Sequence, residues 1–294
     1  MLLARVKVRS VSRPSPSFVR VELAGPDLAE FGVDGPFYDQ RIKLLFPGPA
    51  GLPPLRSDHW WEDYAALPEG ARGTMRTYTV AGVEGDGADA GLLVDIVLHP
   101  GAHGPGSTWA AHVATGDEVL TVVPRRGVPA GGIEFAPGDA RRLLLAGDET
   151  ALPAIARIAA ELPRDAVGTA FVEVPAAGDI RDLGAPAGLE LRWLVRHDRP
   201  VGAPLVEAVG AYLGFAPEPA ADDEVDPDVW ETPTYSSSGE SLAPPQAAED
   251  RYAWIAGEAG MVTTLRRHLV DQLGMPRHRV AFMGYWRQGV SMRG

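Results

Sequence analysis

The sequence predicts two domains, an antiparallel β-barrel followed by a doubly wound, parallel-sheet α/β domain. Three observations support this prediction. The chain has 294 residues, near the size at which a single hydrophobic core stops growing. Residues 1–138 contain short apolar runs separated by Gly, Pro and Asp, which is typical of a β domain. Residues 139–294 alternate strand-like and helix-like segments, which is typical of an α/β domain.

The barrel is expected because six short runs rich in Val, Leu and Ile follow one another along the chain. Turn residues separate them, as in small antiparallel barrels. A short helix is expected near residues 58–67, in the long interruption after the third run. The six runs are Leu3–Val11, Phe18–Leu23, Arg41–Phe46, Thr77–Val83, Gly91–Leu98 and Glu118–Val123.

The second domain is expected because its strands are unbroken apolar runs, which indicates burial on both faces of a parallel sheet. Sheets of this kind bind nucleotides at the carboxyl ends of their strands. The expected strands are Arg142–Ala146, Thr169–Val174, Leu189–Val195, Tyr252–Ala256 and Val280–Tyr285. The expected helices are Ala151–Leu162, residues 203–213 and Gly260–Leu273.

An acidic stretch interrupts the second domain. Residues 218–250 hold ten Asp or Glu residues and no Lys or Arg, and the stretch is also rich in Pro and Ser. This composition predicts a solvated, flexible insert at residues 217–250. A docking site for an electron-donor protein is the functional alternative.

The composition excludes several classes of function. The net charge of −12 argues against general binding to nucleic acid or stable association with an anionic membrane. The chain has no Cys, which excludes disulfides, thiolate nucleophiles and Cys-ligated iron–sulfur clusters. The seven His residues form no metal-ligand pattern, so no metal site is expected. No apolar run approaches about 18 residues, and we expect a cytoplasmic monomer.

The segment Arg76-Thr77-Tyr78-Thr79 begins the fourth strand-like run. It offers a cation, an aromatic face and hydroxyl groups within four residues. An arginine fork binds phosphate through charge-assisted hydrogen bonds, and a flat aromatic ring can cover the ring system of a flavin. On its own, the pattern also fits an edge strand with an exposed Arg and an exposed Tyr.

A glycine-led helix start is predicted at residues 104–110, with the sequence GPGSTWA. The N–H groups at a helix start lack partners within the helix and therefore bind phosphate, aided by the helix dipole. Ser107 would also be a good N-cap and Trp109 fits a core position, so a plain turn and helix cap is the alternative. Together, the two motifs favour a flavin dinucleotide site.

Three strand ends of the second domain carry groups that suit a nucleotide. The turn after the first strand lacks a GxGxxG pattern, but its Asp148 and Thr150 can bond a phosphate or a ribose. Ala256–Met261 has the same strand–turn–helix form, with small residues that allow a nicotinamide or ribose to approach. Trp286 ends the last strand, where its ring would either lie in the core or shield a flavin. An ordinary βα turn is the alternative for the first of these.

Taken together, these segments resemble the siderophore-interacting proteins, which are flavin-dependent ferric-siderophore reductases of the ferredoxin–NADP reductase superfamily. The matching blocks fall in the family's order and span nearly the whole chain. The loop before Gly104 looks longer than is usual, which puts the role of His103 in doubt. The acidic insert is also larger than expected, which would alter access to the nucleotide site. The blocks are RTYTV (76–80), VDIVLH (94–99), GPGSTWA (104–110), GDE (147–149), LPAI (152–155), WIAGEAGMV (254–262), LRRHL (265–269) and GYWRQG (284–289).

The resemblance implies an FAD-binding barrel, residues 1–138, followed by an NAD(P)H-binding domain, residues 139–294. Arg76 would hold the FAD phosphates, and Tyr78 would cover the isoalloxazine ring. Thr79 is the implied catalytic residue because it would hydrogen-bond near N5 of the flavin. The other residues implied to bind a cofactor are Thr77, Asp95, Val97, His99, Gly106, Ser107, Thr108, Trp109, Ala110, Asp148, Glu149, Thr150, Ala151, Arg196, Glu258 and Trp286.

The implied activity is the NAD(P)H-dependent reduction of a ferric siderophore, which releases Fe(II) for iron assimilation. Many ferric siderophores are anionic, so a basic pocket is expected beside the flavin. Lys43, Arg125 and Arg126 follow or lie on barrel strands and are the candidates for substrate binding. Ordinary solvated charges are the alternative for each of them.

The electron donor is expected to be NADPH or NADH. Glu173 ends the second parallel strand, where a carboxylate favours a ribose 2′-hydroxyl. Arg196 and Arg199 follow the third strand, where they suit a 2′-phosphate, and they turn the expectation toward NADPH. The rival functions are a general flavin or electron-transfer reductase and a non-enzymatic siderophore carrier.

Overall fold

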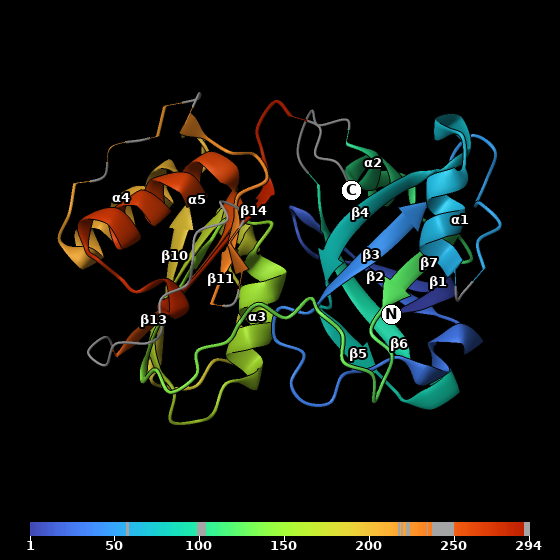
Figure 1. The fold of residues 1–294 in the computed structure, drawn as a ribbon, viewed down its shortest axis with the longest axis horizontal. Coiled ribbons are helices and arrows are strands. Elements are labelled where there is room, and N and C mark those ends of the chain that lie inside the picture. Colours follow the sequence, from blue (N-terminus) through green and yellow to red (C-terminus); the bar gives the residue numbers. More distant parts are fainter. Residues whose placement is uncertain are drawn as a thin grey trace. The chain divides into compact units, whose positions relative to one another are not determined.

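The fold comes from a computed structural model of the chain, drawn in Figure 1. It describes residues 1–56, 59–98, 104–216, 218, 220–221, 224–233, 235–236 and 250–290. The chain divides into two compact units, Met1–Ile133 and Glu134–Arg293, and each unit is described by itself. In the part of the chain that is described, no helix is long and apolar enough to cross a membrane.

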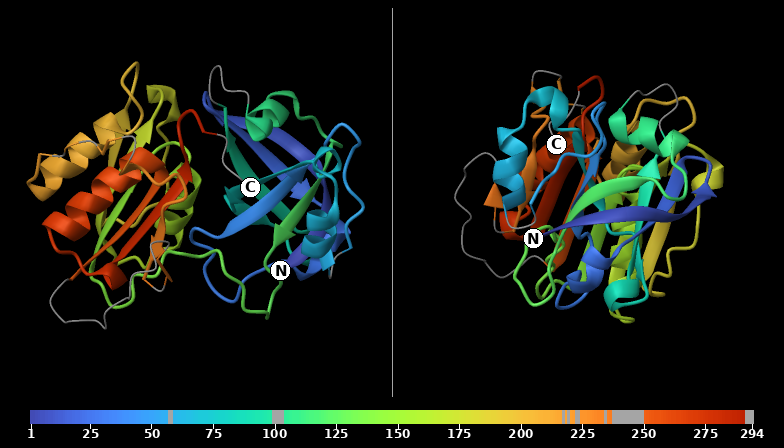
Figure 2. Two further views of the ribbon diagram at one scale, coloured as in Figure 1. Left: turned by 45° about the horizontal axis from the view of Figure 1, so that its top comes forward. Right: turned by 90° about the vertical axis from the view of Figure 1, so that its right-hand side faces the viewer.

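The first unit is a seven-stranded antiparallel sheet in the order β4-β3-β7-β1-β2-β6-β5. Its strands are labelled in Figure 1, and Figure 2 shows the ribbon from two further sides. Inward-facing side chains such as Val6, Val21 and Leu44 are fully buried and form its core. The strands are β1 (Leu2–Ser15), β2 (Phe18–Ala24), β3 (Arg41–Phe46), β4 (Thr74–Thr79), β5 (Gly82–Glu84), β6 (Gly91–Val97) and β7 (Glu118–Val123).

The two edge strands of this sheet, β4 and β5, are consecutive in the chain and are separated by Val80 and Ala81. The N–H of Val80 donates to the carbonyl of Gln40 beside β3, whereas the N–H of Ala81 donates to the carbonyl of Leu93 in β6. The sheet therefore curls until its edges meet, which gives a barrel. The single strand predicted at Thr77–Val83 is wrong because the chain changes its partner strand at Val80.

Two helices cover the barrel, α1 (Trp60–Ala66) and α2 (Pro105–His112). Trp60 and Tyr64 of α1 pack against the outward-facing side chains of Met75 and Leu120. Ala110 of α2 is buried in the barrel core. The start of α2 is therefore held against the barrel by the helix's own apolar side.

The second unit is a mostly parallel sheet in the order β10-β9-β8-β13-β14-β11-β12. The five strands from β10 to β14 in this order are parallel, with α3 on one face and both α4 and α5 on the other (Figure 1). The predicted fold class is therefore confirmed. The parallel strands are β8 (Arg142–Gly147), β9 (Val167–Val174), β10 (Leu189–Val195), β13 (Arg251–Glu258) and β14 (Val280–Trp286). The helices are α3 (Leu152–Glu161), α4 (Ala203–Leu213) and α5 (Ala259–Arg266), and a π-helical segment, Arg267–Gln272, continues α5.

Part of the acidic stretch is built into this sheet. Strand β11 (Trp230–Thr232) pairs antiparallel with β14 and with β12 (Tyr235–Ser236). Glu231 is 4% exposed and accepts hydrogen bonds from Arg266 Nε at 2.9 Å and Arg277 Nη1 at 2.8 Å. The flexible insert predicted at residues 217–250 is therefore wrong for β11, because Glu231 finds arginine partners far along the chain. Residues 237–249 lie outside the described residues.

We expect Trp230→Ala to lower the free energy of unfolding by about 2 kcal/mol, because it removes a half-buried aromatic ring. The Trp230 ring stacks on Tyr285, with ring centres 6.1 Å apart. Tyr235→Ala is the control, since Tyr235 is 56% exposed and its loss should cost less than about 0.5 kcal/mol. Urea unfolding measures both variants, and equal stability of the two would contradict the packing of β11.

Candidate functional site

The residues of the Arg76–Thr79 motif lie on opposite faces of β4. Tyr78 pairs with Ile42 and faces the barrel core, while Met75 and Thr77 face outward, as alternation along a strand requires. The Tyr78 ring meets Phe46 edge-on, with ring centres 6.2 Å apart. Burial raises the pKa of Tyr78, against the opposing charge of Arg76, so the phenol stays protonated.

The start of α2 lies directly against Tyr78. A Cβ built on Gly106 would be 2.0 Å from the Tyr78 hydroxyl oxygen, so any larger residue at this position would force the Tyr78 ring to move. The helix begins at Pro105 with Gly104 as its N-cap, and no side chain caps it. Ser107 is therefore inside the first turn and is not the N-cap. The first turn of α2 thus leaves backbone N–H groups for an anion.

Arg76 supplies a cation whose guanidinium has more N–H donors than its described hydrogen bonds use. Its Nη1 donates to the carbonyl of its neighbour Met75 at 2.7 Å, and among the described residues no carboxylate pairs with it. Lys43 lies on the adjacent strand, where its Nζ donates to Thr77 Oγ1 at 2.8 Å. Burial, followed by the charges of Arg41 and Arg76, lowers the pKa of Lys43. An anion bound beside these groups would relieve their mutual repulsion.

The remaining barrel residues of the predicted site have mixed environments. Thr79 is buried on the outward side of β4. Asp95 is 4% exposed and accepts a bidentate hydrogen bond from Arg20, at 2.6 and 2.9 Å, so its carboxylate ties β6 to β2. Val97 is half-buried at the end of β6. His99 and His103 lie outside the described residues.

The α2 residues also divide between packing and exposure. Gly106 and Ala110 are buried, and the Trp109 ring packs on Phe46 with ring centres 5.0 Å apart. Ser107 is half-buried and Thr108 is exposed. Trp109 therefore contributes to the barrel core. This was the alternative that the sequence offered to a role in cofactor binding.

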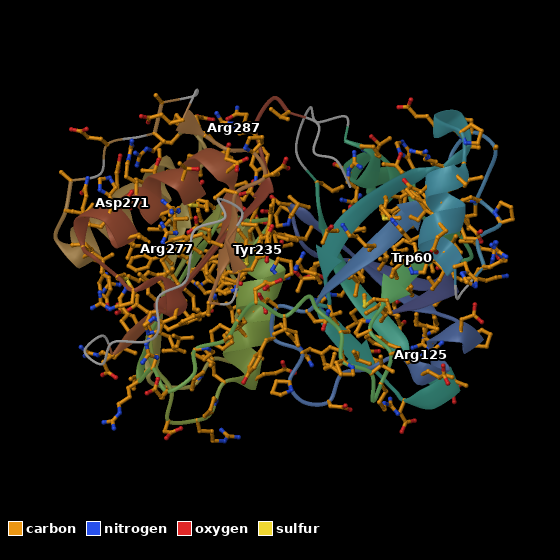
Figure 3. All side chains as sticks on the ribbon, in the orientation of Figure 1. Trp60, Arg125, Tyr235, Asp271, Arg277 and Arg287 are labelled. Carbon is orange, nitrogen blue, oxygen red and sulfur yellow. The ribbon has the colours of Figure 1, made fainter. Side chains whose placement is uncertain are left out.

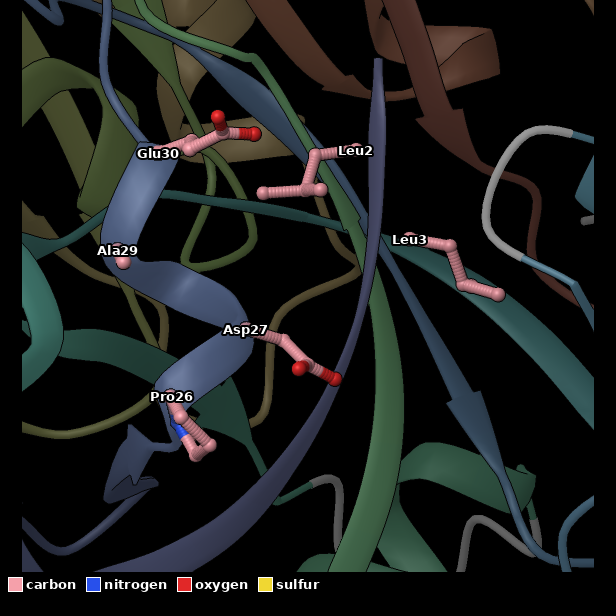
Figure 4. Close-up of a pocket in the computed structure, with 6 residues that line it drawn as sticks. All are labelled: Leu2, Leu3, Pro26, Asp27, Ala29 and Glu30. Atoms are coloured by element: carbon pink, nitrogen blue, oxygen red, sulfur yellow. The ribbon is translucent and has the colours of Figure 1, made fainter.

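The candidate substrate residues have separate partners. The Arg125 guanidinium forms an ion pair with Glu30 at 3.3 Å, and Arg126 Nη2 donates to the carbonyl of Phe31 at 3.2 Å. Both follow β7 and lie beside the 3₁₀ helix Pro26–Glu30, and Arg125 is labelled in Figure 3. No described contact joins either arginine to Lys43. A pocket of about 290 Å³ lies between this 3₁₀ helix and the start of β1 (Figure 4), and none of the predicted site residues lines it.

In the second unit, the Asp148 side chain is bonded to the carboxyl ends of two other strands, β13 and β14. It follows β8 and is fully buried. Its Oδ1 accepts from the N–H and hydroxyl of Thr150, at 2.8 and 2.5 Å. Its Oδ2 accepts from the N–H of Glu258 at 2.7 Å and from Trp286 Nε1 at 2.9 Å. The carboxylate therefore connects the ends of β8, β13 and β14.

A buried ion-pair cluster lies next to Asp148. Arg196 donates to Glu149 at 2.7 and 2.8 Å and to Glu173 at 2.9 Å, and both carboxylates are fully buried. Glu173 also accepts from the N–H groups of Gly202 and Leu205 at the start of α4. Burial lowers the pKa of Arg196, but the two glutamates outweigh this effect and raise it above its ordinary value.

These contacts bear on which nicotinamide cofactor, NADPH or NADH, is the electron donor. The sequence-based preference for NADPH depends on Arg196 and Arg199 being available to a 2′-phosphate. Arg196 is bonded to two carboxylates, and Arg199 pairs with the exposed Glu207 at 2.5 Å. Glu173 in turn caps α4 and bonds Arg196. The contacts of these three residues are structural and give no preference for either nicotinamide.

Glu258 ends β13 and is the N-cap of α5, where its Oε2 accepts from the N–H of Met261 at 3.0 Å. Its Oε1 accepts from Arg287 Nη1 at 2.8 Å, and Arg287 follows β14 (Figure 3). Ala151, another residue predicted to bind a cofactor, is buried at the start of α3. The sequence contained Arg287 within the YWR block, but nothing in the residue spacing identified Glu258 as its partner.

Comparisons with known proteins give consistent matches. Residues 140–289 match a family model described as siderophore-interacting protein, and residues 7–128 match one described as siderophore-interacting FAD-binding domain. A siderophore utilization protein from T. fusca is 31% identical with a TM-score of 0.70, over 98% of this chain and 94% of that one. Ferric vibriobactin reductase of Vibrio cholerae is 29% identical, over 98% of this chain and 89% of its own length.

A more distant structure shows the fold alone. A ferredoxin NADP+ reductase from Neisseria gonorrhoeae is 13% identical with a TM-score of 0.55, over 95% of this chain and 96% of that one.

Proposed function

Because the chain belongs to the siderophore-interacting protein family, as its motifs indicated, we propose that it is an FAD-dependent reductase of ferric siderophores. Its electron donor is NADPH or NADH, and the reaction releases Fe(II) from the siderophore. The ferric vibriobactin reductase among its relatives supports this activity.

The observation that carries the proposal is the arrangement of Tyr78, Gly106 and Arg76 in the first unit. Among the described residues, Tyr78 offers an aromatic ring, the helix start at Gly106 has no side-chain cap, and Arg76 is a cation with no carboxylate partner; a side chain at position 106 would displace the Tyr78 ring. This donor set fits an FAD, since it pairs groups for a pyrophosphate with an aromatic surface for a flat ring.

In this proposal Arg76 and the first turn of α2 would hold the pyrophosphate of FAD, and Tyr78 would contact the flavin ring. Thr79 would offer a hydroxyl to N5 of the flavin, and Val97, at the end of β6, would line the site. Bound FAD would supply the conversion between a two-electron hydride donor and a one-electron ferric acceptor. The chain's own contribution is to bind, orient and neutralise charge.

We expect replacement of Lys43, Arg125 and Arg126 by Gln to raise KM for an anionic ferric siderophore, because the substrate loses attractive charges. A small neutral acceptor should be reduced at an unchanged rate. The effect should shrink with added salt, which screens exposed charges beyond about 8 Å at physiological ionic strength.

The single variants of this set are informative because the three cations have separate partners. If Lys43→Gln alone reproduces the effect, the pocket lies at β3 and β4. Identical kinetics of the wild type and the triple variant would remove all three residues from substrate binding.

The proposed activity is tested by trapping Fe(II) with a chelator while the purified chain, FAD and NADH or NADPH act on a ferric siderophore. We expect Fe(II) to appear at a rate proportional to the protein concentration. Reduction of free flavin without Fe(II) release from the siderophore would favour a general flavin reductase. Binding of the siderophore without FAD or turnover would favour a carrier.

A further inference from the structure

Asp148 holds the last strand of the second unit at the position of its aromatic residue. Trp286 is half-buried, and its Nε1 donates to Asp148 Oδ2 at 2.9 Å across the ends of β14 and β8. The same oxygen accepts from the N–H of Glu258 at the end of β13. One buried carboxylate oxygen therefore fixes the indole relative to two neighbouring strands.

The neighbouring backbone and side chains leave space for the Asp148 carboxylate and donate hydrogen bonds to it. Gly257 has a φ of +139°, and a Cβ built there would lie 2.6 Å from Asp148 Oδ2. The backbone of β13 can approach the carboxylate because this residue is glycine. On the other side, Oδ1 is bonded to both the N–H and the hydroxyl of Thr150.

Full burial and four donors leave Asp148 no surface with which to contact a nucleotide. Resting on the proposed function, we propose that Asp148 is a positioning residue that orients the Trp286 indole at the carboxyl ends of β8, β13 and β14, where a parallel sheet binds its nucleotide. The exposed part of Trp286 would contact the nicotinamide nucleotide there, and Asp148 acts through it. This role replaces direct cofactor binding, which the sequence suggested for Asp148.

An Asn at position 148 cannot reproduce this arrangement. Each carboxylate oxygen of Asp148 faces two donors, whereas an Asn side chain offers one acceptor oxygen and one NH₂ group. In either orientation, Asn would point N–H groups at Trp286 or at Thr150. Asp148→Asn should therefore release the indole or the turn with little change in side-chain volume.

Protonation of Asp148 is compatible with the same contact. Burial, followed by the charge of Glu149, raises the pKa of Asp148 to about 7, against hydrogen bonds from Thr150 and Trp286. The other charged groups nearby are already paired, Glu149 with Arg196 and Glu258 with Arg287. A proton on Oδ1 can be donated to the Thr150 hydroxyl, which then turns to accept it. Oδ2 keeps its bond to Trp286 in both states.

The test is an NMR measurement of the Trp286 indole N–H in the full-length, FAD-loaded protein, with the resonance assigned from Trp286→Phe. In the wild type, we expect the resonance to be shifted by the carboxylate and to titrate near neutral pH. In Asp148→Asn, the shift and the titration should disappear. Flavin reduction by the nicotinamide should slow by roughly tenfold to a hundredfold, while FAD stays bound.

Thr150→Val is the matched control, because it removes a hydroxyl from Oδ1 and leaves the Oδ2 contact intact. Its indole resonance should remain near the wild-type position, with a raised titration midpoint. An indole resonance in the wild type that is insensitive to pH and typical of a solvated Trp would overturn the proposal, even if Asp148→Asn fails to fold. A titrating indole in a protein that reduces no siderophore would leave this inference standing and refute the proposed function.

Discussion

Replacing Arg76 by Ala is expected to weaken FAD binding by roughly tenfold to a hundredfold, the cost of losing charge-assisted hydrogen bonds to a phosphate. Arg76 is the cation beside Tyr78 that has no carboxylate partner among the described residues. The fold should survive the change, since the side chain donates one hydrogen bond to the carbonyl of Met75. FAD titration by fluorescence quenching measures the affinity, and thermal unfolding checks the fold.

Two control variants make this result specific. Arg126→Ala removes the same charge from a guanidinium that bonds the carbonyl of Phe31, and it should leave FAD affinity unchanged. Thr79→Ala should keep FAD bound but alter the rate at which the flavin is reduced. Full FAD occupancy with unchanged reduction kinetics in both Arg76→Ala and Thr79→Ala would refute the assignment of β4 to the flavin site.

Replacing Arg196 by Met is expected to lower the free energy of unfolding by about 3–5 kcal/mol, because two fully buried carboxylates lose their shared partner. Glu149 and Glu173 are both 0% exposed, and Arg196 bonds each of them. Urea unfolding at neutral pH gives the magnitude. Arg199→Met is the control, since its pair with Glu207 is exposed and should be worth less than about 1 kcal/mol.

The loss of stability in Arg196→Met is expected to become smaller as the pH falls. Burial raises the pKa of Glu173 above its unfolded value, despite hydrogen bonds from Gly202 and Arg196. A buried acid of this kind binds its proton more tightly in the folded state, so folding gains stability as the pH falls through the folded pKa. The difference between Arg196→Met and the wild type should therefore shrink in acid. A small difference that does not vary with pH would show that Arg196 is not the partner of these carboxylates.

The sequence predicted most of the fold because strands and helices leave local patterns. The runs Arg41–Phe46, Glu118–Val123 and Leu189–Val195 are strands with the predicted bounds. The break between β4 and β5 was missed because a partner change within a continuous β run leaves no local pattern. Strand β11 was missed because Glu231 is stabilised by Arg266 and Arg277, which are distant in sequence.

The site was harder to predict for the same physical reason. The sequence motifs pointed to Tyr78 and Gly106 separately, but the close approach of the two residues depends on how α2 packs against the barrel. Asp148 and Arg196 were identified by their positions at strand ends, yet their partners come from other strands. Sequence position can place a polar side chain at a strand end, but only tertiary packing decides whether it is buried in an ion pair or open to a ligand.

The proposed function is tested most directly by the visible absorption of the FAD-loaded protein under anaerobic conditions. The account predicts that NADH or NADPH bleaches the flavin absorption and that a ferric siderophore then restores it, with two ferric ions reduced for each flavin because each takes one electron. Flavin absorption that stays bleached after the ferric siderophore is added would contradict the account.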